Sequence, residues 1–168
     1  MGLSPDHAAR EALSRAASRI PLSAGRLYDK QLYHLTLVFL GQMDDEDIPR
    51  LLSAADEAFD GPFPLTLSGK MDTFKRGTVV WAGVEDSRPL TELHARLREN
   101  LLRLGFPGGE EIYTPHITLG RGVRLTGDLP RVERVTFPAA RVTLYESLRL
   151  EGKLTYRPIG RMGACADG

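Results

Sequence analysis

The sequence predicts an α+β fold of mixed helices and antiparallel strands, built as a single domain over residues 1–168. Three segments carry apolar residues at helical spacing, and seven other runs have the β-branched and aromatic content of strands. The last two runs are separated by only three residues, 151–153, which predicts a β-hairpin. The chain has 42% apolar and 26% charged residues, a composition typical of a globular protein with a real core.

Each of the three expected helices has a start or stop signal. The first covers 4–20, with Ser4 as its N-cap and a proline directly after it. The second covers 44–59 after an aspartate cap and has an acidic outer face. The third, 89–104, is the clearest, because leucines recur along one face and Gly105 can adopt the left-handed conformation that ends a helix. We expect this leucine stripe to be core rather than a cofactor site.

The seven expected strands lie before, between and after these helices. They cover residues 32–40, 63–71, 78–84, 116–123, 132–137, 142–150 and 154–159. No glycine-rich phosphate loop of the strand-to-helix kind occurs, and no low-complexity linker divides the chain. One undivided domain is therefore expected.

The charges are balanced overall but unevenly distributed. The formal net charge is zero, yet residues 44–60 hold seven acids against one arginine, and residues 121–168 hold nine basic residues against five acids. The basic C-terminal part is consistent with a surface that faces an anion. The alternative is that its arginines simply occupy solvent-facing strand positions.

The single cysteine, Cys165, excludes an intrachain disulfide and lies in a small-residue tail, 163–168, that we expect to be disordered. The N-terminus has no signal-peptide pattern, and no apolar run approaches the roughly 20 residues that span a bilayer. We therefore expect a cytoplasmic monomer without membrane association.

One short pattern occurs twice in the chain. His-Leu-Thr-Leu at 34–37 is repeated as His-Ile-Thr-Leu at 116–119, so the two histidines are 82 residues apart, about half the chain length. This spacing suggests two similar, pseudo-symmetric lobes that each contribute one copy. Side chains alternate across a strand, so each histidine shares a face with its threonine while the aliphatic residues point to the core.

Two such copies brought face to face would offer two imidazoles and two hydroxyls to one phosphate. Hydrolysis of a phosphodiester by in-line attack needs a base for the water and an acid for the departing oxygen, on opposite sides of phosphorus. With an ordinary pKa of about 6.5, one imidazole can be neutral while the other is protonated. We expect His34 and His116 to fill these roles without a metal, because the sequence lacks the ligand spacing of a zinc or two-metal site.

The alternative is that His34 and His116 are strand histidines whose nitrogens are satisfied by local hydrogen bonds. The other two histidines provide a comparison, because neither His7 nor His94 is followed by a hydroxyl residue two places later. We expect those two to be structural or solvated.

With both motifs in view, the chain resembles the two-histidine (2H) phosphoesterase superfamily, and within it the RNA 2′,3′-cyclic phosphodiesterases, also called the 2′-5′ RNA ligase family. The similarity runs over most of the chain. It includes HLTLVFLG at 34–41, VVWAGV at 79–84, LRLGF at 102–106 and PHITLGR at 115–121.

The resemblance implies a bilobal fold with two antiparallel sheets that line a central cleft, and helices packed outside. It also implies hydrolysis of an RNA-terminal 2′,3′-cyclic phosphate to a 2′-phosphate with no cofactor. His34 and His116 would be catalytic, with His34 the acid and His116 the base. Thr36, Thr118 and Arg121 would bind the phosphate. Arg121 would point away from His116 in a regular strand, so its role requires a twist or bulge near its flanking glycines.

Two features depart from the family pattern. Family members commonly open with an apolar strand before the first helix, whereas this chain reaches its expected helix by Ser4, so the sheet is expected to lack that strand unless the true start lies upstream. Val38 stands where the first motif often has a basic residue, and we give it no role.

Several functions remain open from the sequence. The motifs also suit a 2′-5′ RNA ligase acting on tRNA halves or a phosphodiesterase of small cyclic nucleotides, and a non-enzymatic RNA-end binding module would not need both histidines. Phe39 and Tyr113 are candidates for stacking on a nucleobase, although core packing is favoured for Phe39 and for Trp81.

Overall fold

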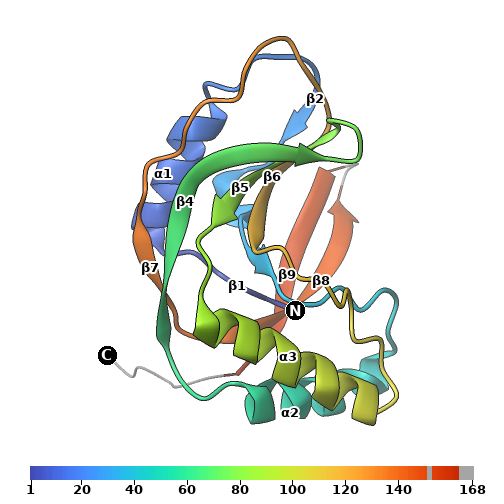
Figure 1. Ribbon diagram of the computed structural model, residues 1–168. Helices are drawn as coiled ribbons and strands as arrows, with labels where there is room; N and C mark the ends of the chain where they lie inside the picture. Colours follow the sequence, from blue (N-terminus) through green and yellow to red (C-terminus); the bar gives the residue numbers. More distant parts are fainter. Residues whose placement is uncertain (151–152, 163–168) are drawn as a thin grey trace.

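The computed structural model describes residues 1–150 and 153–162, and it confirms the α+β class (Figure 1). The expected tail at 163–168 lies outside the described residues. The helices are α1 (His7–Ala17), η1 (Lys30–Leu32), η2 (Asp45–Asp47), α2 (Ile48–Ala58) and α3 (Arg88–Arg103). The strands are β1 (Gly2–Leu3), β2 (Leu22–Leu27), β3 (Leu35–Thr36), β4 (Phe63–Phe74), β5 (Val79–Val84), β6 (His116–Leu125), β7 (Thr136–Ala139), β8 (Val142–Leu150) and β9 (Lys153–Met162).

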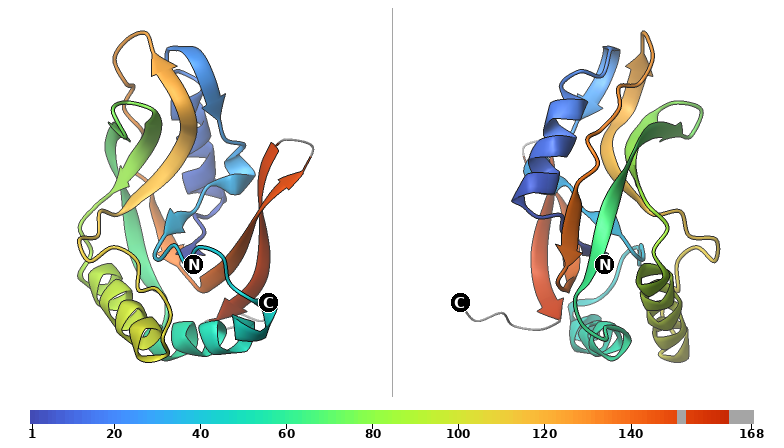
Figure 2. Two further views of the ribbon diagram at one scale, coloured as in Figure 1. Left: turned by 90° about the vertical axis from the view of Figure 1, so that its right-hand side faces the viewer. Right: turned by 60° about the vertical axis from the view of Figure 1, so that its left-hand side comes forward.

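The strands form one curled antiparallel sheet in the order β7-β4-β5-β6-β3-β1-β8-β9, and β2 pairs with the distal part of β6. The hairpin β8–β9 and the strands β5 and β6 rise on either side of β3 (Figure 2). The two sheets implied by the resemblance are therefore continuous through β1 and β3. The joint is narrow, because β3 pairs with β6 only through Leu35 and Ile117.

The strand before the first helix is present, contrary to the expectation from the sequence. Gly2 and Leu3 form β1, which pairs with β3 on one side and β8 on the other. Leu3 is fully buried. Two residues are too few to show a period-2 pattern, which is why no sequence signal predicts this strand.

The first motif strand is much shorter than the expected run 32–40. Residues 30–32 form a 3₁₀ turn, and the backbone N–H groups of Leu37 and Val38 both donate to the Met1 carbonyl oxygen. Because these donors are satisfied outside a strand ladder, only Leu35 and Thr36 remain in β3. The strand expected at 132–137 is shifted to 136–139, and β2 was not expected.

The start of α1 differs from the prediction. The carboxylate of Asp6 accepts from the backbone N–H of Ala9 and caps the helix, whereas the hydroxyl of Ser4 hydrogen-bonds to the hydroxyl of Tyr145. The helix also ends at Ala17, before the predicted Ile20.

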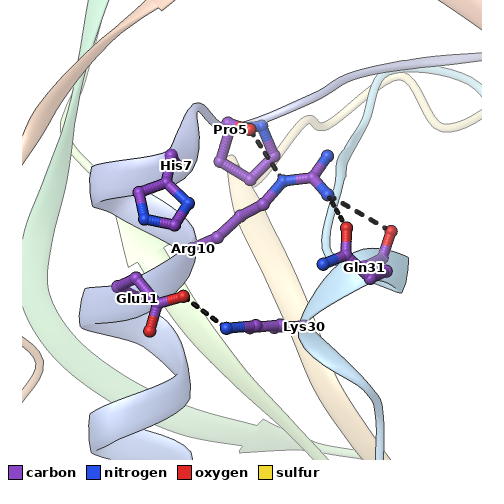
Figure 3. A pocket seen from close by; sticks show the side chains of 6 residues that line it. All are labelled: Pro5, His7, Arg10, Glu11, Lys30 and Gln31. Atoms are coloured by element: carbon purple, nitrogen blue, oxygen red, sulfur yellow. Dashed lines mark hydrogen bonds and ion pairs between the residues drawn. The ribbon is translucent and has the colours of Figure 1, made fainter.

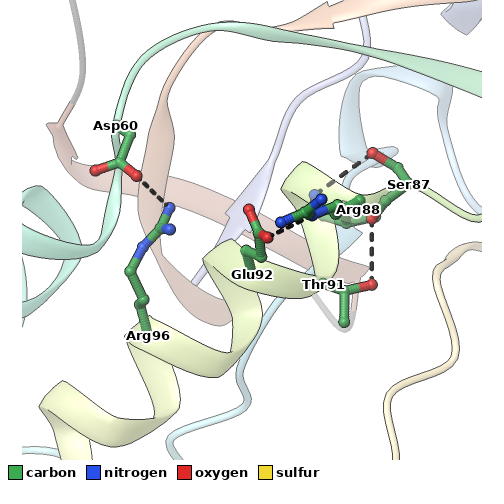
Figure 4. A network of polar contacts seen from close by, with 7 residues as sticks. Asp60, Ser87, Arg88, Thr91, Glu92 and Arg96 are labelled. Carbon is green, nitrogen blue, oxygen red and sulfur yellow. Dashed lines mark hydrogen bonds and ion pairs between the residues drawn. The ribbon is translucent and has the colours of Figure 1, made fainter.

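The second and third helices are close to their predicted bounds and pack side by side at one end of the sheet (Figure 1). Ser87 caps α3, and Arg96 forms an ion pair at 3.0 Å with Asp60, just beyond α2 (Figure 4). The leucine stripe of α3 is core as predicted, since Leu90, Leu93, Leu97 and Leu101 are at most 1% exposed. No helix of the described residues is long and apolar enough to cross a membrane.

Candidate active site

The two copies of the repeated motif lie on neighbouring antiparallel strands. Leu35 of β3 is paired with Ile117 of β6, and both side chains are fully buried. Continuing this register by one residue sets His34 opposite Thr118, and Thr36 opposite His116. Since side chains alternate, these four polar side chains share the face opposite the two buried aliphatic residues.

This register places the histidines at diagonal corners of a four-residue rectangle. Directly opposed positions are about 4.5–5.5 Å apart and diagonal ones about 7–8 Å. A phosphate between the corners would meet one imidazole on each side. His34, His116, Thr36 and Thr118 are all partly exposed on this face.

Both imidazoles are held by the same local contact. Nδ1 of His34 lies 2.9 Å from the carbonyl oxygen of Leu32, and Nδ1 of His116 lies 2.7 Å from that of Thr114. Each contact joins the ring to the residue two places earlier and requires a proton on Nδ1. In the neutral ring, Nε2 is then the free acceptor. The local hydrogen bonds of the structural alternative therefore exist, but they satisfy only one nitrogen of each ring.

Each histidine also packs against two aromatic rings. His34 lies 5.0 Å from Tyr145 and 4.7 Å from Tyr156 between ring centroids. His116 lies 4.9 Å from Phe74 and 5.8 Å from Trp81. The aromatic rings restrict the orientation of each imidazole and remove water from around it.

This burial has an electrostatic consequence. Loss of hydration lowers the pKa of His34, and the nearby amino terminus, His116 and Arg10 lower it further, against the Leu32 hydrogen bond. Burial likewise lowers the pKa of His116, against the Thr114 hydrogen bond, and the charge of Arg121 adds to the lowering. Both imidazoles therefore favour the neutral state in the free protein at neutral pH.

We expect a bell-shaped dependence of kcat/KM on pH, with its maximum on the acid side of the ordinary imidazole pKa of about 6.5. The reason is that one ring must be protonated and the other neutral, and both pKa values are lowered. Initial rates on a cyclic phosphate substrate between about pH 4 and 9, with enzyme stability checked at each pH, measure this. A maximum clearly above about pH 7 would contradict the expectation.

Arg121 reaches the face of the histidines through a bulge in β6. Val80 pairs with Gly120 but the next residue, Trp81, pairs with Thr118, so β6 has one extra residue at this point. The extra residue reverses the alternation of side chains. Arg121 is exposed there, close enough to His116 to influence its pKa. The bulge that its position required is thus present.

Tyr113 connects the second motif to the first instead of offering a stacking surface. Its hydroxyl donates to the carbonyl oxygen of Thr36 at 3.0 Å, and its ring stacks on His94 at 4.1 Å. Tyr113 therefore has a structural role in place of the nucleobase stacking considered for it. His94 is a buried structural residue. The core position favoured for Phe39 is wrong, because this side chain is 77% exposed.

Replacing Tyr113 with phenylalanine is expected to lower kcat by about 3–30-fold with little change in folding. The variant keeps the stack on His94 and loses one hydrogen bond, worth about 0.5–1.5 kcal/mol, at a joint where a small displacement of the motifs matters. Steady-state kinetics and urea unfolding check this. An unchanged kcat for Tyr113→Phe would contradict the prediction.

A second surface feature borders η1, which lies just before the first motif in the chain. A depression of about 340 Å³ lies between α1 and η1, and is lined by Pro5, His7, Arg10, Glu11, Lys30 and Gln31 (Figure 3). Its two main cations already have hydrogen-bond partners: Lys30 bonds to Glu11, and Arg10 donates to the side chain of Gln31 at 3.1 Å. Among the described residues, no group of three or more His, Cys, Asp or Glu side chains is placed to hold a metal ion.

Comparison with known proteins agrees with this geometry. The sequence model of the 2′-5′ RNA ligase superfamily matches residues 4–149. The chain belongs to this superfamily. A superfamily relative from Escherichia coli K12, named RNA 2′,3′-cyclic phosphodiesterase, is 31% identical over 147 residues, which are 86% of this chain and 83% of the relative. The crystal structure of E. coli LigT complexed with 3′-AMP aligns with a TM-score of 0.85 at 29% identity, over 98% of this chain and 95% of that chain.

Other relatives with the same name are matched over less of their length. The Geobacillus stearothermophilus protein is 34% identical over 67% of this chain, but the match spans only 38% of that protein. The matches span 65% of the Archaeoglobus fulgidus relative and 49% of the Thermotoga maritima relative.

Sequence reasoning missed three side chains of the candidate site. Phe74, Tyr145 and Tyr156 come from β4, β8 and β9, far in the sequence from the histidines they contact. Each lies on a strand that does not pair directly with either motif strand, so the place of these strands in the sheet had no signal in the sequence. Trp81 was expected in the core, and it instead packs against His116.

Proposed function

We propose that this chain hydrolyses RNA-terminal 2′,3′-cyclic phosphates to 2′-phosphates, by acid–base catalysis with two histidines and without a metal. The observation that carries the proposal is the register Leu35 to Ile117, which sets two imidazoles diagonally across one polar face. The names of the relatives support the substrate, since they are RNA 2′,3′-cyclic phosphodiesterases. The LigT complexes with 3′-AMP and with phosphate support a site for a nucleotide phosphate.

In the proposed reaction, Nε2 of His116 takes a proton from water as the water oxygen attacks phosphorus. The bond from phosphorus to O3′ breaks on the opposite side, and His34 delivers a proton to O3′. The product carries a 2′-phosphate and a free 3′-hydroxyl, so atoms and charge balance. The hydroxyls of Thr36 and Thr118 and the guanidinium of Arg121 would hold the phosphate oxygens and stabilise their developing charge.

Catalysis needs one protonated imidazole, but both are mainly neutral in the free protein. We propose that substrate binding causes one of them to gain a proton. Both imidazoles have lowered pKa values before binding. An anionic phosphate placed between them favours the protonated form of the nearer ring and raises its pKa. We propose that His34 gains its proton in this way, while Arg121 keeps the pKa of His116 low and so keeps that ring a base.

The test is incubation of the purified chain with an oligoribonucleotide that ends in a 2′,3′-cyclic phosphate, in excess EDTA, with the product identified by mass spectrometry and phosphatase sensitivity. We expect full activity and a 2′-phosphate product, because the two histidines supply both proton transfers. Complete loss of activity that zinc or manganese restores would overturn metal independence. A 3′-phosphate product would overturn the assignment of the broken bond, and formation of a 2′-5′ linkage with a second RNA end would favour ligation.

A further inference from the structure

A row of facing side chains crosses four strands just beyond the phosphate site. The register pairs Phe74 of β4 with Val79 of β5, Val79 with Arg121 of β6, and Arg121 with Arg26 of β2. Directly opposed residues in antiparallel strands share a face. Arg26 and Arg121 therefore lie side by side on the face that carries the histidines, with Phe74 at the other end of the row against His116.

Two further cations follow Phe74 in the chain. Lys75 and Arg76 form the turn of the β4–β5 hairpin, where both have positive φ angles of 51° and 56°, and both side chains are exposed. The turn lies beside β6, since the N–H of Val123 donates to the carbonyl oxygen of Thr78 at 3.1 Å. Arg26, Arg121, Lys75 and Arg76 thus all lie at the same end of β5 and β6, and we call these four residues the basic strip.

The basic strip is not neutralised by the protein. None of the ion pairs found in the described part of the chain involves any of its four side chains. Other arginines of the basic C-terminal part are paired, as Arg134 is with Glu85 and Arg157 with Glu146. Two like charges directly opposite one another destabilise a sheet, so an unpaired Arg26 beside Arg121 is costly without an anion between them.

We propose that the basic strip binds the phosphodiester backbone of the RNA on the 5′ side of the cyclic phosphate. The inference rests on the proposed function, and it makes an RNA chain, not a free cyclic nucleotide, the preferred substrate. Arg121 belongs both to the strip and to the phosphate site, so the strip begins where the RNA end is held. The net charge of the chain is zero, so this attraction is local rather than general.

The test compares the wild type and a strip variant on two substrates, one with an RNA chain and one without. The variant Arg26→Gln/Lys75→Gln/Arg76→Gln removes three charges from the strip and leaves Arg121 in place. Both proteins are assayed on cytidine 2′,3′-cyclic phosphate and on a short oligoribonucleotide with a cyclic phosphate end, at several salt concentrations. The control Arg15→Gln/Arg88→Gln/Arg103→Gln removes three exposed charges from α1 and α3.

We expect kcat/KM of the strip variant to fall about tenfold or more on the oligonucleotide at low salt, and less than about twofold on the nucleoside cyclic phosphate. The slope of log kcat/KM against log salt should become shallower by about one for each phosphate that the variant no longer binds. The control variant should retain the wild-type ratio of the two activities.

Equal reductions on both substrates, no reduction on either, or the same reduction in the control variant would each overturn the basic strip as an RNA site. The affinity for RNA is also measured without catalysis, by fluorescence anisotropy with the same RNA ending in a 3′-phosphate. This measurement tests the basic strip separately from the proposed function. If the wild type cleaved neither substrate, the proposed function would fail, while weaker RNA binding by the strip variant would still support the strip. Equal RNA affinity of the wild type and the strip variant would reject the basic strip as an RNA site.

Discussion

Replacing either His34 or His116 with alanine is expected to slow hydrolysis of an RNA cyclic phosphate by about 10²–10⁴-fold, because each change removes the donor or acceptor of one proton transfer. The neighbouring aromatic side chains cannot readily replace a lost imidazole in proton transfer. Phe74 and Trp81 beside His116 do not titrate, and burial raises the pKa of Tyr156 beside His34. Single-turnover rates with saturating enzyme measure the chemical step without interference from product release.

A substrate with sulfur in place of O3′ separates the two roles. The thiolate leaves without protonation, so this analogue should restore much of the rate of His34→Ala and leave His116→Ala slow. Rescue of His116→Ala instead would exchange the assigned roles. Rescue of neither would mean that at least one histidine acts by positioning or charge. Thr36→Ala is a useful companion, because removal of one neutral hydrogen bond should reduce the rate less than removal of either histidine.

Truncating Leu35 to alanine is expected to lower the free energy of unfolding by about 2–5 kcal/mol. This side chain is fully buried and belongs to the residue pair that joins β3 to β6. The cavity would also loosen the register that sets His34 against Thr118, so activity should fall by more than the smaller folded fraction explains.

Leu97→Ala in α3 provides the matched control, because Leu97 is also fully buried but lies in the helical core. Urea unfolding gives the stability of both variants, and rates are compared under conditions where each is folded. We expect similar decreases in stability and a lower rate only for Leu35→Ala. Equal rates for the two folded variants would show that the joint does not control the site.

The motifs could be predicted from the sequence because the arrangement within each motif depends only on neighbouring residues of one strand. Alternation along a strand is enough to place His34 with Thr36, and His116 with Thr118, whatever the strands pair with. The need for a bulge before Arg121 also followed from alternation, since an odd spacing from His116 puts a side chain on the wrong face. The register of β5 and β6 contains that bulge.

The rest of the site depends on pairing between distant strands, which no local pattern encodes. Neither the adjacency of β3 and β6 nor the arrival of Tyr145 and Tyr156 beside His34 has a sequence signal. The strand β1 was missed because two residues carry no period, and the long predicted run at 32–40 was reduced because Met1 satisfies the next two backbone donors.

Trp81 is the only tryptophan in the chain, and its ring centroid lies 5.8 Å from that of His116. A protonated imidazole quenches indole emission more strongly than a neutral one does. The intrinsic fluorescence of this protein therefore reports the charge of one histidine and not of the other, which packs against tyrosines instead. The protein thus contains its own optical reporter, and a titration of its emission against pH follows the charge of His116 without a label.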